Sequence, residues 1–455
     1  MSRSVIVQIG RLDKNYRSKI KFQYDGEIGE AELSSDFLLT NKEFNNTRQL
    51  IIFPKSIVFQ DYLINDEQLV ESDPFIKLLK ELDVEEYISN PKPILNKHPH
   101  IKSETDLLIL PSIGSYNFKQ KSIELETSLD LITIQIYLYL INTYANDEYE
   151  KIYLDISSGH NIYITALINA AYRYLPFIRF KRFLEDEKNK FSGFIMSSEP
   201  ILPGSNHPIK IEKSIFTAKA FNTFTYKDSA SIGKLVKKVF KKQDYYKELY
   251  DFVERQYFLL HGAFIYGTPF LLLLADEKTL YKLFVEVGIN KILSDFNDFV
   301  SESENEKFNT NEVYSLTYAI ALSHSVYMEF KEVINAKEIE FEIQEEKLSN
   351  DLLKDAYKNV SKVYGQPEPG YINEVENIYK EFLKIQTPSN QFFSGADIKK
   401  ENNPDYNINE FDSRNYFAHY GCELNCFEIK VEKDKLITRY NNLVNVKSIL
   451  KYLKK

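Results

Sequence analysis

The segment Lys151-Ile152-Tyr153-Leu154-Asp155-Ile156-Ser157-Ser158-Gly159-His160-Asn161 decides the fold of the N-terminal half. Its first six residues are mostly apolar, which predicts a strand buried on both faces. Small and polar residues follow, and residues 162–174 then have the apolar composition of a buried helix. A buried strand that runs through a short polar loop into a helix is the repeating unit of a parallel sheet of Rossmann type.

Other segments of the N-terminal half extend this pattern. Apolar runs at 4–10, 50–53 and 107–110 predict three more buried strands. Helices are predicted at 75–88 and at 128–144, and a hairpin with Asp25-Gly26 as its turn is predicted over 19–33. Because the strands are buried on both faces and joined by helices, we expect a mostly parallel sheet.

The pattern becomes helical from about residue 215 onward. Two segments break it, 338–343 and 427–432, where apolar and polar residues alternate as in short strands. The polar stretch 395–412 is predicted to be irregular. The predicted fold class is therefore an α/β Rossmann-like N-terminal domain, followed by a mainly α-helical C-terminal half with a small β appendage.

Composition limits the possible functions. The chain of 455 residues has a formal net charge of −9, so no overall field attracts nucleic acid. The most apolar run, 259–274, is too short to cross a bilayer, and Met1 is followed directly by a strand rather than a signal peptide. We expect a cytoplasmic protein without a membrane segment. Cys422 and Cys426 lack the spacing of a redox or zinc motif and are interpreted as small core residues.

Three predicted strand ends carry loops suited to a ligand. They are Gly10-Arg11, Pro111-Ser112-Ile113-Gly114-Ser115 and Ser157-Ser158-Gly159-His160-Asn161. Ligands of open parallel sheets bind at the carboxyl ends of the strands, where small residues let them approach the backbone. The alternative for each loop is ordinary turn chemistry. The sequence has neither a Gly-x-Gly-x-x-Gly motif nor a Walker loop, which disfavours a dinucleotide cofactor.

The C-terminal half contains Arg414-Asn415-Tyr416-Phe417-Ala418-His419. Histidine can move protons near neutral pH, and arginine can stabilise the charge that develops on a phosphate. No cluster of metal-ligating residues accompanies the motif, so we expect metal-free cleavage of a phosphodiester, with the 2′-hydroxyl of RNA as the nucleophile. The alternative is a surface helix end with a hydrogen-bonded histidine. A second pair, Arg255 and His261, is interpreted as part of a buried aromatic helix.

Together these segments resemble the CARF–HEPN ribonucleases of type III CRISPR systems. The strand, Asp155 and the loop that follows are similar to the ligand loop of CARF domains, and Arg414 to His419 is similar to the Arg-x-x-x-x-His motif of HEPN domains. Many members have glycines and a basic residue where this chain has Ser158, Gly159 and His160. Two alternatives follow from this departure: His160 binds phosphate or adenine in place of the basic residue, or it changes which ring size is preferred.

The resemblance implies a sensor coupled to an effector. CARF domains of this family dimerise and bind a cyclic oligoadenylate across the two-fold axis, and paired HEPN motifs form one composite RNase site. It implies a CARF domain at 1–215, a helical linker region at 216–350 and a HEPN ribonuclease domain at 351–455. The site residues implied for the ligand are Ser158, Gly159, His160 and Asn161, with Arg11, Ser112, Ile113 and Gly114 matched by position only. Arg414 and His419 are the implied catalytic pair, and Asn415, one helical turn before His419, is placed to orient it.

We therefore predict a metal-independent, single-strand RNA endonuclease of CRISPR antiviral defence. Cyclic tetra-adenylate is the default activator, no cofactor or metal is expected, and the partners are RNA and a second copy of the chain. Two alternatives stay open. One is a ligand-sensing regulator that binds DNA through the basic helix at 234–247. The other is a ring nuclease that degrades its own cyclic ligand near Ser158 or His160.

Overall fold

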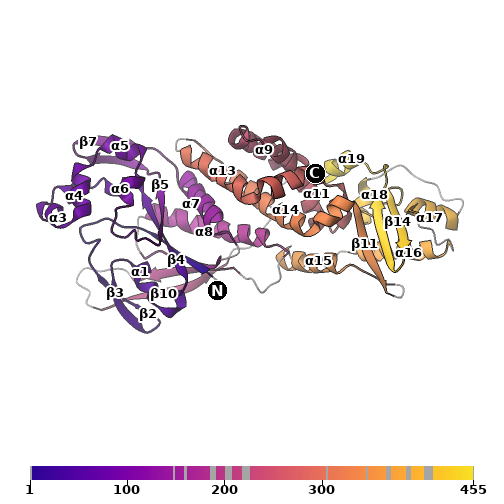
Figure 1. The fold of residues 1–455 in the computed structure, drawn as a ribbon, viewed down its shortest axis with the longest axis horizontal. Coiled ribbons are helices and arrows are strands. Elements are labelled where there is room, and N and C mark those ends of the chain that lie inside the picture. Colours follow the sequence, from indigo (N-terminus) through magenta and orange to yellow (C-terminus); the bar gives the residue numbers. More distant parts are fainter. Residues whose placement is uncertain are drawn as a thin grey trace. The chain divides into compact units, whose positions relative to one another are not determined.

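The computed structural model describes most of the chain (Figure 1). The described residues are 3–146, 149–157, 161–184, 191–199, 207–217, 226–303, 306–344, 347–364, 370–385, 391–403 and 413–453, without the side chains of 226–228, 360–364 and 413–415. The chain divides into two compact units. Unit 1 contains Met1–Ile178, Glu187–Lys219 and Leu293–Thr310, and unit 2 contains Arg179–Asp186, Ala220–Ile292 and Asn311–Lys455. The domain limits at 215 and 350 stay predictions.

Unit 1 is built on an eight-stranded sheet with the order β3-β2-β10-β9-β8-β1-β4-β5. The five strands from β9 to β5 are parallel, and β10 and β3 run antiparallel to β9 and β2. This confirms the predicted Rossmann-like α/β sheet. The strands are β1 (Arg3–Ile9), β2 (Ile20–Tyr24), β3 (Glu27–Ala31), β4 (Thr47–Pro54), β5 (Thr105–Leu110), β8 (Tyr149–Asp155), β9 (Ser192–Ser198) and β10 (Ile209–Phe216).

Helices and a small hairpin complete unit 1. Their bounds are α1 (Ser34–Leu38), α2 (Asp61–Ile64), α3 (Glu67–Ser72), α4 (Pro74–Glu81), α5 (Val84–Ser89), α6 (Lys92–Leu95), the hairpin β6 (Gly114–Phe118) and β7 (Lys121–Leu125), α7 (Leu129–Tyr144) and α8 (Asn161–Lys181). The helix predicted at 75–88 is wrong as a single element. Asp83 interrupts it, because its carboxylate accepts the backbone N–H groups of Glu85 and Glu86 at 2.9 and 3.0 Å and so begins α5.

Two other local predictions for unit 1 are confirmed. Strands β2 and β3 form a hairpin whose turn residues, Asp25 and Gly26, have φ angles of 46° and 81°. These left-handed values are the ones that a two-residue hairpin turn requires. Ser128 is the N-cap of α7, and its hydroxyl accepts the Leu131 N–H at 3.1 Å.

Unit 2 is rich in helices and contains a five-stranded sheet with the order β12-β11-β15-β14-β13. This confirms a helical C-terminal half with a small β appendage. Its helices are α9 (Tyr226–Phe240), α10 (Tyr246–Asp251), α11 (Tyr257–Ile265), α12 (Glu277–Tyr281), α14 (Thr310–Ala336), α15 (Asp351–Tyr364), α16 (Tyr371–Leu383), α17 (Gly395–Asn402), α18 (Ser413–Ala418) and α19 (Val446–Leu453). Helix α13 (Ile289–Glu302) begins in unit 2 and continues from Leu293 in unit 1. Its strands are β11 (Glu338–Gln344), β12 (Lys347–Ser349), β13 (Phe393–Ser394), β14 (Phe427–Glu432) and β15 (Lys435–Tyr440).

The first part of the stretch predicted as irregular, 395–412, is the helix α17. Ser394 begins the helix by accepting the Asp397 N–H at 3.0 Å, and burial of Ala396 and Ile398 holds it. Residues 404–412 lie outside the described residues. Cys422 and Cys426 are both buried and form no disulfide, as the interpretation of small core residues expects. Within the described part of the chain, no helix is long and apolar enough to cross a membrane.

Candidate functional site

The parallel strands of unit 1 bring the predicted ligand loops to one edge of the sheet. Ile9 pairs in register with Ile52, Pro54 with Leu110, and Gln8 with Asp155. The chain therefore leaves β1, β4, β5 and β8 at the same edge, the carboxyl edge. Arg11, Ser112, Ile113, Gly114 and Asn161 all follow one of these strand ends. Ser158, Gly159 and His160 lie outside the described residues.

Ser112 is buried, and its hydroxyl faces protein rather than solvent. It accepts the Ser56 N–H at 2.9 Å, which ties the loop after β5 to the loop after β4. Burial raises the pKa of Tyr163, in the first turn of α8, and hydrogen bonds with Ser112, Ser56 and the backbone of Ile113 oppose that rise. Ser112 thus joins two strand ends and the start of α8. Ser56 and Tyr163 were missed in the sequence, where nothing sets them apart from other core and turn residues.

The neighbouring residues Ile113 and Gly114 shape the backbone of the same loop. The Ile113 carbonyl accepts the Tyr116 hydroxyl at 2.7 Å, which holds the loop against the β6–β7 hairpin. Gly114 is exposed and has a φ angle of 124°, a conformation that residues with a side chain rarely adopt. This loop therefore offers a bare backbone at the carboxyl edge, where a ligand can approach closely.

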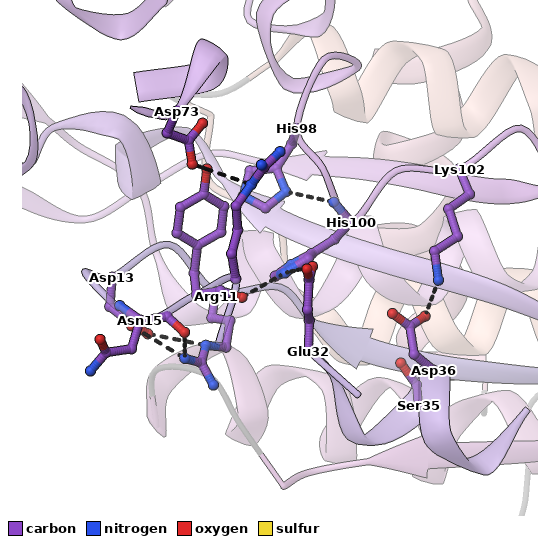
Figure 2. A network of polar contacts seen from close by, with 12 residues as sticks. Arg11, Asp13, Asn15, Glu32, Ser35, Asp36, Asp73, His98, His100 and Lys102 are labelled. Carbon is purple, nitrogen blue, oxygen red and sulfur yellow. Dashed lines mark hydrogen bonds and ion pairs between the residues drawn. The ribbon is translucent and has the colours of Figure 1, made fainter. Parts of the chain in front are cut away.

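Arg11 is turned back onto its own loop, as Figure 2 shows. Its Nε lies 3.1 Å from Asp13 Oδ2, and its Nη2 donates to the Asn15 carbonyl at 2.8 Å. Only 15% of the side chain is exposed. In this conformation the guanidinium lies against Asp13 and Nη2 donates within the loop, so contact of this face with an anionic ligand requires Arg11 to exchange the Asp13 carboxylate for that ligand.

A buried cluster that includes Asp73, His98 and His100 packs behind the Arg11 loop (Figure 2). The Tyr16 hydroxyl donates to Asp73 at 2.7 Å, and Asp73 also caps α4 by accepting the Phe75 N–H at 2.9 Å. The rings of His98 and His100 lie 5.3 and 5.7 Å from the Tyr16 ring. Burial lowers the pKa of His98 well below its usual value and that of His100 to about 4. These neutral, buried rings fix the position of the loop that carries Arg11.

Asp155 holds the start of the last ligand loop. Its carboxylate is fully buried, and it accepts the Ser34 hydroxyl at 2.7 Å and the Ser157 N–H at 3.0 Å. Burial raises the pKa of Asp155, and these hydrogen bonds oppose the rise. Asn161 begins α8 with an exposed side chain, and its carbonyl accepts the Thr165 hydroxyl at 2.8 Å. Of the predicted ligand residues, Asn161 and Gly114 are the described ones whose surfaces are open at this edge.

In unit 2, residues 414–418 of the Arg-to-His motif belong to α18, and the side chains of Arg414 and Asn415 are not described. The next residue, Tyr416, is fully buried, and its hydroxyl donates to the Tyr440 hydroxyl oxygen at 2.7 Å. Tyr440 belongs to β15 and donates its hydroxyl hydrogen to the Gly421 carbonyl at 2.8 Å. Strand β15 therefore holds α18 and the turn after it in place.

His419 is the residue at which α18 ends. The Gly421 N–H donates to the Tyr416 carbonyl at 2.7 Å, and the Tyr420 N–H donates to the Phe417 carbonyl at 3.3 Å. Tyr420 and Gly421 have φ angles of 51° and 91°, so the two bonds form a Schellman motif with His419 at the C-cap. A tightly closed helix end thus fixes the backbone of His419.

The His419 side chain combines exposure with one carboxylate partner. Its Nδ1 lies 3.4 Å from Oε2 of Glu374 in α16, and 53% of the side chain is exposed. An ionised carboxylate only accepts hydrogen bonds, so Nδ1 is the donor and Nε2 is left to exchange a proton with a substrate. Sequence reasoning missed Glu374, because it lies 45 residues before His419 and no local motif marks it.

The second Arg–His pair has the expected structural role. The His261 ring stacks on Tyr257 at 5.0 Å, and burial lowers the pKa of His261 to about 4. Arg255 lies 3.5 Å from Asp251 at the surface. Among the described residues, no group of three or more His, Cys, Asp or Glu side chains is placed to hold a metal ion.

The sheet edge and its loops agree with a comparison against protein families. Residues 4–200 match the family model of the CRISPR system endoribonuclease Csx1, CARF domain. The match supports a CARF domain at the predicted place and, through its description, relates the chain to CRISPR endoribonucleases. It ends before α9 and does not include α18 or His419. A comparison with curated proteins finds no match.

Proposed function

We propose that the protein is a metal-independent, single-strand RNA endonuclease of CRISPR defence that a cyclic oligoadenylate activates. The match of residues 4–200 to the CARF domain of an endoribonuclease supports the sensing part. The position of the His419 side chain is the observation that supports the proposed nuclease activity. An exposed imidazole stands at a fixed helix end with Nδ1 against a carboxylate, which is the arrangement that a general acid or base needs.

The proposed reaction is attack of the 2′-hydroxyl of RNA on the adjacent phosphorus. The new O2′–P bond replaces the P–O5′ bond, so the products carry a 2′,3′-cyclic phosphate and a 5′-hydroxyl. His419 takes part in transfer of the proton between the 2′-hydroxyl and the departing 5′-oxygen, with Nε2 as the exchanging atom. Arg414 stabilises the charge that develops on the phosphate. Glu374 fixes the tautomer and the orientation of the ring.

Two copies of α18 form the proposed composite site in a homodimer. Arg414 and His419 are about 140° apart around an ideal helix, so one helix does not point both side chains at a single phosphate. Helices paired across a two-fold axis can bring both residue types together. Asn415 is proposed to orient His419 from one turn earlier.

The proposed activator is cyclic tetra-adenylate, bound by two copies of the carboxyl edge of unit 1. Arg11, the backbone of Ile113 and Gly114, and residues 158–161 are the proposed ligand contacts. Ser112 supports them from the interior through Ser56. The ligand activates only if it binds the active arrangement more tightly than the inactive one, because equal affinities shift no equilibrium.

Cleavage of single-stranded RNA with and without cyclic adenylates of different ring sizes tests the proposal. One ring size is expected to raise the rate, and His419→Ala is expected to lower it by about 10²–10⁴-fold. His207→Ala is the matched control, because His207 is a histidine with 72% of its side chain exposed that has no proposed role. Full activity of the His419→Ala protein would contradict the assignment of this motif.

Calorimetry separates the sensing part from the nuclease part. We expect one cyclic tetra-adenylate per two chains, with the same affinity in the wild-type and His419→Ala proteins. One ring per single chain, or no binding of any cyclic adenylate, would contradict the proposed ligand site while leaving the nuclease assignment open to its own assay.

A further inference from the structure

A cluster of aromatic rings surrounds Phe417 in the motif helix. The Phe417 ring stacks on Tyr452 with a centroid distance of 4.4 Å and an interplanar angle of 16°. Tyr266 lies edge-on at 5.8 Å, and the buried Tyr416 ring lies at 5.1 Å. Phe417 thus forms the centre of the cluster, and Tyr266 and Tyr452 form its outer part.

The C-terminal helix α19 positions Tyr452. Ile449, Leu450 and Leu453 are its buried residues. A Cβ atom at Gly262 would lie 2.9 Å from Leu453 Cδ2, so the glycine allows α19 to pack closely on α11. Figure 1 shows α18, α19 and α11 side by side. The cluster therefore rests on packed helices rather than on a loop.

The outer rings of the cluster are open to solvent. Tyr452 has 38% of its surface exposed and Tyr266 has 47%. Both rings contact Phe417, and burial together with the neighbouring Tyr452 raises the pKa of Tyr266. Phe417 stacks on one face of the Tyr452 ring, and the exposed part of Tyr452 is available for contact with a planar group.

The helix that carries Tyr452 has positive charge in an acidic protein. The chain has a net charge of −9, whereas α19 contains Lys447 and Lys451 and no acidic residue. Both lysines are exposed and lie one helical turn apart. Exposed aromatic rings next to lysines are the combination that binds single-stranded nucleic acid, through base stacking and phosphate contacts.

We propose that Tyr452 and Tyr266, backed by Phe417, form a stacking platform for a base of the single-stranded RNA substrate. Lys447 and Lys451 contact its phosphates. This inference rests on the proposed nuclease function, because Phe417 lies one helical turn after position 414 and two residues before His419. The platform holds a nucleotide near the one to be cut and favours substrates whose bases are unpaired.

RNA binding to the full-length His419→Ala protein tests the platform without cleavage. Adding Tyr452→Leu is expected to raise the Kd for a short single-stranded RNA roughly tenfold, because stacking of one base on an aromatic ring contributes a free energy of about that size. Tyr452→Phe keeps the ring and is expected to bind as the parent does. Tyr281→Leu is the matched control, because Tyr281 is a tyrosine of unit 2 with 44% of its surface exposed.

Abasic RNA gives a measurement that does not depend on how well the variant folds. For the parent protein, removing the stacked base is expected to weaken binding about as much as Tyr452→Leu does. The Tyr452→Leu protein is then expected to bind the abasic and intact RNAs equally. Equal Kd values for the parent and Tyr452→Leu proteins would overturn the platform. Tight, Tyr452-dependent binding by a wild-type protein that cuts no RNA would support it and contradict the nuclease function instead.

Discussion

Acidification is expected to destabilise unit 1 through His100. This ring is fully buried, with Nε2 3.1 Å from the Tyr16 carbonyl and 3.6 Å from the Glu32 carboxylate. Burial is the largest cause that lowers its pKa from 6.5 to about 4, and the Arg11 and Lys102 charges add to the effect. The Tyr16 backbone and Asp36 oppose it without reversing it.

The sign and size of the effect follow from these pKa values. Between pH 6.5 and pH 4 the unfolded chain binds a proton on residue 100 that the folded chain does not. The free energy of unfolding is therefore highest above pH 6.5 and falls as the pH is lowered. At about 1.4 kcal/mol per pH unit, the loss is about 2 kcal/mol at pH 5 and about 3 kcal/mol at pH 4.

Urea unfolding of the wild-type and His100→Gln proteins at pH 7 and pH 5 measures this effect. Glutamine does not titrate, and its amide can still donate to the Tyr16 carbonyl. For each protein, the free energy of unfolding at pH 5 is subtracted from that at pH 7. The contributions of the carboxylates are common to both proteins, so they cancel when the two differences are compared. Circular dichroism suits the assay, since the chain has no tryptophan, and amide hydrogen exchange assigns the change to unit 1. Equal pH dependence in the two proteins would refute the reasoning.

Three further predictions concern packing and chemistry. Gly10→Ala is expected to lower the free energy of unfolding, measured with heat or urea, by about 1–3 kcal/mol, because its Cβ would lie 2.1 Å from the buried Phe53 ring. Gly233→Ala in α9 is the control: its Cβ would meet nothing closer than 3.4 Å, and the change is expected to be neutral or stabilising. Excess EDTA is expected to leave RNA cleavage unchanged, and a 2′-deoxy nucleotide at the cut position is expected to block it; products with 5′-phosphate ends would contradict the mechanism. Glu374→Ala is expected to lower kcat on the order of tenfold with little change in KM, since the His419 ring loses its partner, and an unchanged kcat would show that the 3.4 Å contact has no part in catalysis.

The sequence by itself determined the sheet and the helical half, because both depend on local patterns. An apolar run such as 151–156 predicts a strand buried on both faces before the strands that pair with it are known. The turn at Asp25-Gly26 and the N-cap at Ser128 each depend on a few adjacent residues. For the same reason the CARF segment was predictable from the loop that follows Asp155, and the comparison supports it.

Only the tertiary structure decided which side chains meet at the sites. Arg11 pairs with Asp13 and donates to the Asn15 carbonyl, and the Ser112 hydroxyl accepts the Ser56 N–H rather than facing the loop surface. No sequence pattern indicates these contacts. The helix α17 forms in a polar stretch because burial of Ala396 and Ile398 outweighs weak local preference. Glu374 reaches His419 across 45 residues, since contacts between distant segments depend on the packing of whole helices and not on the composition of either one.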